Sequence, residues 1–196
     1  MNKILFNNSE FHFSENDLPC LIHYCEGTGG SHFSVTMIAD MFLKGSKIIF
    51  LTAYHMAKDN FLEQVKGRGD DVLFATSHDQ LIDKKQAIII ESGNENLFLE
   101  ALSSLDDIDE RIIFIKNFEK FDGNVVLAAN NKQKLIISGN LDSSSIKNEL
   151  LDKKYKTIIQ FSKPNIAITK KLPDLKKYMG YFWQNDRDGL ISVINE

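Results

Sequence analysis

Short apolar segments recur along the chain, and most are followed by a segment with helical periodicity. The segment 47–52, KIIFLT, carries apolar residues at odd and even positions, so a strand formed by it would be apolar on both faces. Such strands lie inside parallel sheets that helices cover on both sides. The alternation therefore predicts an α/β fold, a three-layer sandwich with a mostly parallel sheet. The other expected strands are 21–25, 71–76, 86–90, 111–115, 135–138 and 157–161, and the expected helices are 31–43, 56–65, 94–105, 121–130 and 144–151, with a brief helix or turn over 79–83.

The two ends of the chain have a different pattern. Residues 178–183, YMGYFW, and 190–194, LISVI, flank a turn-rich stretch that ends in glycine, which predicts a C-terminal antiparallel hairpin. Alternating apolar positions within residues 1–19 predict a small hairpin or cover strand. The sequence contains no repeat, low-complexity tract or linker, so we expect residues 1–196 to form a single domain.

A glycine-rich stretch, EGTGGS, lies between the first expected strand and the first expected helix. A loop in this position directs its backbone N–H groups and the positive end of the helix dipole at one small volume, which suits an anion such as phosphate. A Walker A loop requires Gly, four residues, and then Gly-Lys-Ser/Thr. In the better register Gly29 and Ser31 match, while Tyr24 and Gly30 replace the first Gly and the Lys. In the other register, 27–34, only the two ends match.

The better register predicts a degenerate phosphate cradle. Gly30 brings no ammonium to the β and γ phosphates, and a backbone amide replaces that charge poorly. A protonated His32 could replace it, or the three glycines could form a tight turn that binds no ligand. The candidate nucleotide-binding residues are Glu26, Gly27, Thr28, Gly29, Gly30, Ser31 and His32.

Composition limits the partners and the location. With 43% hydrophobic and 26% charged residues the chain can bury a core, and its net charge of −4 does not indicate a nucleic-acid-binding surface. Lysines cluster at 153–156 and 170–177, so a local basic patch and a nucleic-acid partner stay open. Cys20 and Cys25 point to opposite faces of one strand and are not expected to pair. We expect a cytoplasmic protein without membrane insertion, because no run is long enough for a signal sequence or a spanning helix.

The loop after LIHYC, the strands IIIES and RIIFIKN, the strand LIISGN and the closing hairpin together resemble a RecA-like P-loop NTPase. This grouping includes KaiC-type domains and HerA-type and conjugation-type motor domains. The resemblance implies ATP or ADP with Mg²⁺ as the cofactor, or none if the loop is only a turn. It also implies work in an assembly, either a homo-oligomer or a complex with protein partners.

The resemblance also implies a Walker B strand that ends in an acid, which holds Mg²⁺ through water. Strand 86–90 ends in Glu91, whereas strand 111–115 has no acid at its tip and is followed by Glu119. Glu91 is therefore the favoured candidate and Glu119 the reserve, with Ser31 and Glu91 as the expected metal ligands. A missing Lys and an unsettled acid together indicate a pseudo-ATPase.

Three functions follow from these observations. The first is a noncatalytic scaffold or regulatory subunit of a larger assembly. The second is an active ATP-binding and ATP-hydrolysing protein, with a cation supplied by a neighbouring subunit if needed. The third is a class I, S-adenosylmethionine-dependent methyltransferase that uses EGTGG as its glycine loop. That enzyme class needs an acid at the end of the second strand, where this chain has the residues LTAY at 51–54.

Overall fold

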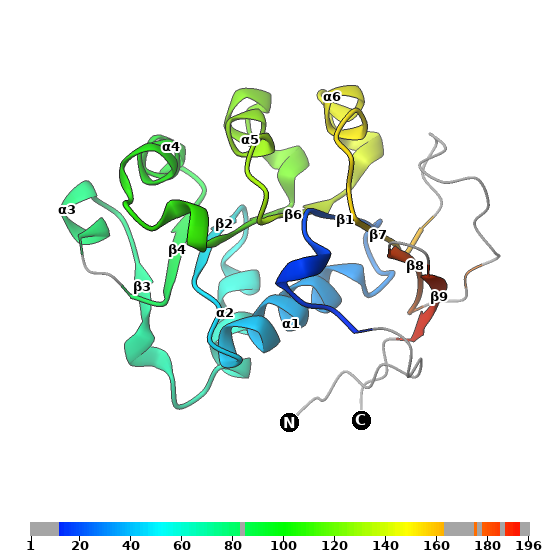
Figure 1. Ribbon diagram of the computed structural model, residues 1–196, viewed down its shortest axis with the longest axis horizontal. Helices are drawn as coiled ribbons and strands as arrows, with labels where there is room; N and C mark the ends of the chain where they lie inside the picture. The colour runs from blue at the N-terminus through cyan, green and yellow to red at the C-terminus, as the bar shows by residue number, and fades with distance from the viewer. Residues whose placement is uncertain (1–11, 83–84, 163–174, 176–177, 185–186, 193–196) are drawn as a thin grey trace.

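The computed structural model describes residues 12–82, 85–162, 175, 178–184 and 187–192. In this part of the chain one nine-stranded sheet has the order β3-β4-β2-β5-β6-β1-β7-β8-β9 (Figure 1). The pairs from β3 to β7 are parallel, and β7-β8 and β8-β9 are antiparallel. The predicted three-layer α/β fold with a C-terminal antiparallel hairpin is thereby confirmed. The strands are β1 Cys20–His23, β2 Ile48–Thr52, β3 Val72–Phe74, β4 Ala87–Glu91, β5 Ile112–Lys116, β6 Leu135–Gly139, β7 Thr157–Gln160, β8 Met179–Gln184 and β9 Arg187–Ser192.

Helices cover both faces of the sheet. In Figure 1, α1 and α2 lie below it, and α4, α5 and α6 lie above it. The α-helices are α1 Gly30–Leu43, α2 His55–Gln64, α3 His78–Leu81, α4 Glu95–Ser104, α5 Gly123–Asn130 and α6 Lys147–Leu151. Short 3-10 helices are η1 Glu15–Asp17, η2 Gly69–Asp71, η3 Ile108–Glu110, η4 Phe118–Lys120 and η5 Leu141–Ser143.

Each central strand contributes to two separate hydrophobic cores, because successive side chains point to opposite faces. In β2, Ile48 and Phe50 belong to the core under α1 and α2. Ile49 and Leu51 belong to the core under α3, α4, α5 and α6. All four are fully buried, and each contributes about 1.5–3 kcal/mol relative to an exposed position. The sequence pattern with apolar residues at odd and even positions thus arises because alternate side chains of one strand are buried in two different cores.

The strand order decides which loops are neighbours. β1 lies between β6 and β7, and β2 is separated from it by β6 and β5. Rossmann-like sheets instead place the second strand beside the first, where its terminal acid reaches the cofactor ribose. The structure therefore does not support the methyltransferase interpretation, since the end of β2 is not adjacent to the loop after β1.

The ends of the described chain differ in detail from expectation. β9 begins at Arg187, paired with Gln184, so residues predicted as loop extend the hairpin, while 193–194 lie outside the described residues. Of the hairpin predicted within 1–19, residues 1–11 also lie outside, and 12–19 contain η1 and no strand. Both cysteines are free. None of the helices in the described residues combines the length and the hydrophobicity that crossing a membrane requires.

Candidate functional site

The glycine-rich loop connects β1 to α1 at the carboxyl edge of the parallel strands. The Tyr24 N–H donates to the Gly139 carbonyl at 3.1 Å, which ties the start of the loop to β6. The Thr28 hydroxyl donates to the Cys25 carbonyl at 2.7 Å and closes a turn. Gly29 is the N-cap of α1 with φ of 90°, a left-handed conformation that favours glycine. The predicted strand, loop and helix are all present.

The first turn of α1 has no side-chain cap, and the Tyr178 side chain lies against its N-cap Gly29. The Gly29 cap forms no side-chain hydrogen bond, and the first N–H groups of a helix have no acceptor within the helix. Ser31 is exposed there. Ser34, which the other register would use, is buried and donates to the Ser31 carbonyl at 3.0 Å. Ser31 is therefore the exposed hydroxyl at the loop.

Gly30 has no space for a side chain. A Cβ added there would lie 2.5 Å from Cβ of Tyr24 and 2.8 Å from Cδ2 of Phe161. Both distances are shorter than real Cβ contacts allow. Tyr24 fills the space that a lysine at position 30 would enter. The two departures from the Walker A pattern, Tyr24 and Gly30, therefore belong to the same packing contact.

A lysine reaches the loop from another strand. Lys116 is the last residue of β5, which is separated from β1 only by β6, and it is fully buried. Its Nζ donates to the Ser31 Oγ at 2.9 Å and to the Tyr24 hydroxyl. Asn117, with φ of 58°, also donates to the Tyr24 hydroxyl, at 3.2 Å. An ammonium therefore contacts the serine that the family resemblance assigns to a metal ion.

Burial determines the charge states around this contact. It lowers the pKa of Lys116 from 10.5 to about 7, against a smaller opposing effect of the Glu119 carboxylate. Burial, followed by the Glu119 charge, raises the pKa of Tyr24, so this side chain stays a neutral phenol. Burial also lowers the pKa of His32, which leaves its ring neutral at pH 7. His32 therefore does not supply the positive charge that the sequence analysis considered as a replacement for the loop lysine.

The structure does not bring Glu91 beside Ser31. Glu91 ends β4, and β2, β5 and β6 lie between β4 and β1, a separation of about 19 Å at the usual strand spacing. Its carboxylate instead accepts from His55 Nδ1 at 2.6 Å and pairs with Lys58 Nζ at 3.1 Å. This arrangement explains Glu91 as a surface ion pair and gives it no route to a metal shared with Ser31.

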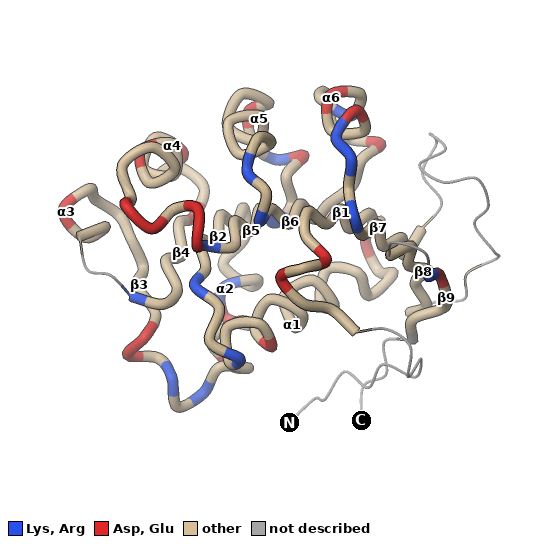
Figure 2. Tube along the Cα trace, viewed as in Figure 1, with Lys and Arg blue, Asp and Glu red and all other residues tan. Residues whose placement is uncertain are grey.

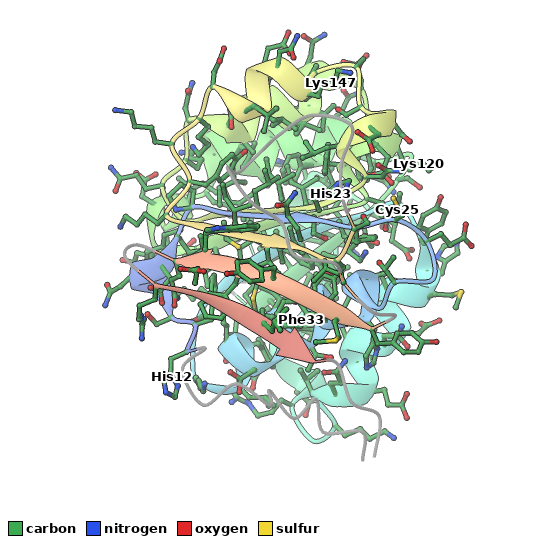
Figure 3. The ribbon with its side chains drawn as sticks, turned by 90° about the vertical axis from the view of Figure 1, so that its right-hand side faces the viewer. His12, His23, Cys25, Phe33, Lys120 and Lys147 are labelled. Carbon is green, nitrogen blue, oxygen red and sulfur yellow. The ribbon has the colours of Figure 1, made fainter. Side chains whose placement is uncertain are left out.

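Glu119 lies closer to the loop, and its carboxylate is engaged elsewhere. Its Oε2 accepts the Asn140 N–H at 3.1 Å, at the end of β6. Glu26 is exposed on the loop. In Figure 3, Cys25 at the start of the loop and Lys120 beyond β5 lie towards the same side of the molecule, which is the edge that carries the site.

The residues around Ser31 do not fit a magnesium ion. Mg²⁺ prefers oxygen ligands, commonly carboxylates and water. The described residues contain no group of three or more His, Cys, Asp or Glu side chains that could hold a metal. At Ser31 the nearest charged group is the Lys116 ammonium, which repels a second cation. We therefore derive no step through a metal ion here.

His23, at the tip of β1, is a second buried group beside the loop. Its Nδ1 accepts the Leu141 N–H at 3.2 Å, so Nε2 carries the proton and faces the Ser162 hydroxyl at 3.1 Å. Burial lowers the pKa of His23 to about 4. With its free lone pair already used by a backbone N–H, this imidazole cannot take the Ser162 proton, so the pair is structural.

Tyr24 and Lys116 are the site residues that sequence reasoning did not single out for a role. Both were visible as departures, Tyr24 from the first glycine and Lys116 from the expected acid. A lysine directly after the apolar run IIFI was the available signal, because lysine is seldom fully buried. What the sequence did not reveal was that the two residues touch.

Comparisons with known proteins show a similarity in structure and none in sequence. No protein-family model and no curated protein sequence matches the chain. Its structure is similar to the genome packaging NTPase B204 from Sulfolobus turreted icosahedral virus 2 in complex with AMPPCP, with a TM-score of 0.60 and 12% identity over 93% of this chain and 100% of that chain.

Two further structures of the same viral NTPase are also similar. The complex with AMP has a TM-score of 0.57 and 12% identity over 88% of this chain and 94% of that chain. The complex with ATP-gammaS has a TM-score of 0.54 and 11% identity over 89% of this chain and 96% of that chain. At this identity the similarity shows a common fold alone.

Proposed function

We propose that this chain is a RecA-like P-loop domain, residues 1–196, that does not hydrolyse ATP and serves as a scaffold or regulatory subunit of a larger assembly. The observation that carries the proposal is the 2.9 Å contact between Lys116 Nζ and Ser31 Oγ. Hydrolysis in P-loop NTPases depends on a metal ion and a loop lysine that neutralise charge on the transferred phosphoryl group. Here the loop lysine is absent, and an ammonium lies where the metal would be held.

The common fold with a nucleotide-bound packaging NTPase supports a nucleotide as the ligand. The uncapped first turn of α1 supports phosphate as the group that is bound. An active ATPase would need a metal-binding acid near Ser31. Glu91 lies at the end of a distant strand, and the Glu119 carboxylate accepts a hydrogen bond from a backbone N–H. The noncatalytic interpretation needs no such group.

Phosphate release from ATP and Mg²⁺ tests this proposal. We expect no release above that of a protein-free sample, even at high protein concentration. Ser31→Ala is the matched control, because turnover that persists in this variant comes from a contaminating enzyme. Magnesium-dependent turnover that Ser31→Ala abolishes would contradict the proposal and favour an active ATPase.

The assembly part of the proposal rests on the family resemblance and on the packaging role of the similar viral protein. The partner is either a second copy of this chain or another protein. Positions of both charge signs are spread over both helical layers in Figure 2, so a protein partner is favoured over nucleic acid. Light scattering is expected to give a multiple of 22.3 kDa for a homo-oligomer. A monomer at high concentration would contradict self-assembly.

A further inference from the structure

Lys116 is a buried ammonium without a counterion in the described residues. No carboxylate of those residues lies within ion-pair distance of its Nζ, although the group is fully buried. Two of its three N–H bonds are used, by the neutral oxygens of Tyr24 and Ser31. A buried charge is costly unless it is paired, so burial favours the neutral amine, and an anion at the loop would favour the ammonium.

The groups around this ammonium favour an anion at the loop. Tyr24 faces it from the end of β1, Ser31 from α1, and Ser138 is its register partner on β6. From its own segment, Asn117 contacts the same phenol, and the Glu119 carboxylate acts from a distance while bonded to the Asn140 N–H. Only one of these groups is an acid, and it is already engaged.

Two sources of positive potential therefore meet at one hydroxyl. Ser31 is the second residue of the 14-residue helix α1, so the positive end of the helix dipole lies on one side of its Oγ. The Lys116 ammonium donates to the same Oγ at 2.9 Å. An anion seated on the first turn of α1 would experience both, with no metal ion between.

We propose that the loop binds the phosphate chain of a nucleotide in its metal-free form, with Lys116 supplying the positive charge that Mg²⁺ and a loop lysine supply elsewhere. This inference rests on the proposed function, since it concerns the same loop. The lysine lies at the tip of β5 and not in the loop, and the cation it provides is part of the fold. A magnesium ion carried in by the nucleotide would meet this ammonium and weaken binding.

Calorimetric titration of ADP into the full chain at pH 6.5, once with EDTA and once with excess Mg²⁺, tests the proposal. ADP has no γ-phosphate to release, so binding is measured apart from turnover. We expect binding in EDTA and weaker binding in Mg²⁺. Because this comparison uses the unmodified chain, it does not depend on the folding of any variant.

Lys116→Met is the informative variant, and Lys120→Met is its matched control, with the same loss of charge from an exposed side chain four residues further on. Lys116→Met removes the positive charge beside Ser31, so it should weaken ADP binding by roughly 10-fold or more. Lys120→Met should leave it within about 2-fold, as expected for an exposed charge. Pyrophosphate, titrated in parallel, should bind no more tightly than ADP.

The outcomes separate this inference from the proposed function. Binding that requires Mg²⁺, or equal affinity in Lys116→Met, would overturn the role of Lys116 and leave the absence of hydrolysis standing. Absence of ADP binding under both conditions would overturn it as well. Binding of pyrophosphate without ADP would overturn the choice of a nucleotide. Magnesium-dependent phosphate release in the earlier assay would instead contradict the proposed function itself.

Discussion

Strands β4 and β5 of the same parallel sheet each end in a charged residue, and the two charges lie in opposite surroundings. Glu91 at the tip of β4 is partly exposed, and its carboxylate contacts His55 Nδ1 and pairs with the Lys58 ammonium. Lys116 at the tip of β5 is fully buried, donates to the neutral oxygens of Tyr24 and Ser31, and has its Nζ over the Tyr24 ring, 4.4 Å from the ring centroid. The acid, which suits a metal site, ends the strand farther from the loop, and β5, the nearer of the two strands, ends in the opposite charge.

The difference shows that position in the sheet, more than residue type, decides which charge can act at the loop. Burial raises the pKa of Glu91, but its pairing with His55 and Lys58 outweighs this effect and lowers that pKa overall. Burial without an anionic partner lowers the pKa of Lys116 to about 7. The charge of Glu91 is thus stabilised by its partners, whereas the charge of Lys116 has no anionic partner in the described residues.

The largest expected effect is a pH dependence of stability that belongs to Lys116. The folded chain releases this proton near pH 7 and the unfolded chain near 10.5, so the unfolded state binds more protons between these values. The free energy of unfolding should therefore rise with pH, by about 1.4 kcal/mol per unit for this one group. Denaturant unfolding of wild type and Lys116→Met from pH 7 to 8.5 measures it as the difference between the two.

In that experiment the difference between wild type and Lys116→Met should grow with pH in favour of wild type. Lys120→Met should follow the wild-type curve, because its exposed side chain has no comparable environment. Parallel curves for wild type and Lys116→Met would mean that Lys116 keeps an ordinary pKa, and the contrast between β4 and β5 would be lost.

A comparable effect is expected from the packing that excludes a lysine from the loop. Gly30→Ala places a Cβ against Tyr24 and Phe161, so we expect a loss of about 1–3 kcal/mol in the free energy of unfolding. Gly69→Ala is the control, since an added Cβ there meets nothing within 4 Å. Thermal unfolding of the two variants measures the difference. Equal stabilities would show that the space beside Gly30 is not closed.

The smallest effect is expected at the tip of β4. Glu91→Gln removes two partly exposed ion pairs, and pairs of this kind contribute at most about 1 kcal/mol. ADP binding should not change, because β2, β5 and β6 separate Glu91 from the loop. A loss of nucleotide affinity in Glu91→Gln, measured by the same calorimetric titration, would restore Glu91 as a site residue.

Much of the fold could be predicted from the sequence, because strands such as β2 are apolar on both faces. This pattern indicates a parallel sheet that helices cover on both sides. The strand–loop–helix unit around Ser31 was also predictable, since glycine and helix periodicity are local signals. Strand order is not local. Glu91 and Lys116 both end apolar strands, and only the crossovers of the folded chain place β5, not β4, one strand away from β1.

The candidate site was predictable only in part for a related reason. Tyr24 and Gly30 stand at opposite ends of the loop pattern and read as two independent losses. In the folded chain Tyr24 packs against Gly30, and the Tyr24 hydroxyl also accepts a hydrogen bond from the Lys116 ammonium at the end of β5. The loop motif lacks its lysine at Gly30, and the charge comes from Lys116, 86 positions further along the chain. A local motif carries no signal of such a distant residue.

The most direct test of the central claim is whether a divalent cation is held at Ser31. Electron paramagnetic resonance of Mn²⁺ with ADP, recorded with and without the protein, reports on this directly. We predict that the protein produces no signal from a protein-bound Mn²⁺–nucleotide complex, because the Lys116 ammonium contacts the Ser31 hydroxyl. A bound Mn²⁺ signal that disappears in Ser31→Ala would contradict the account.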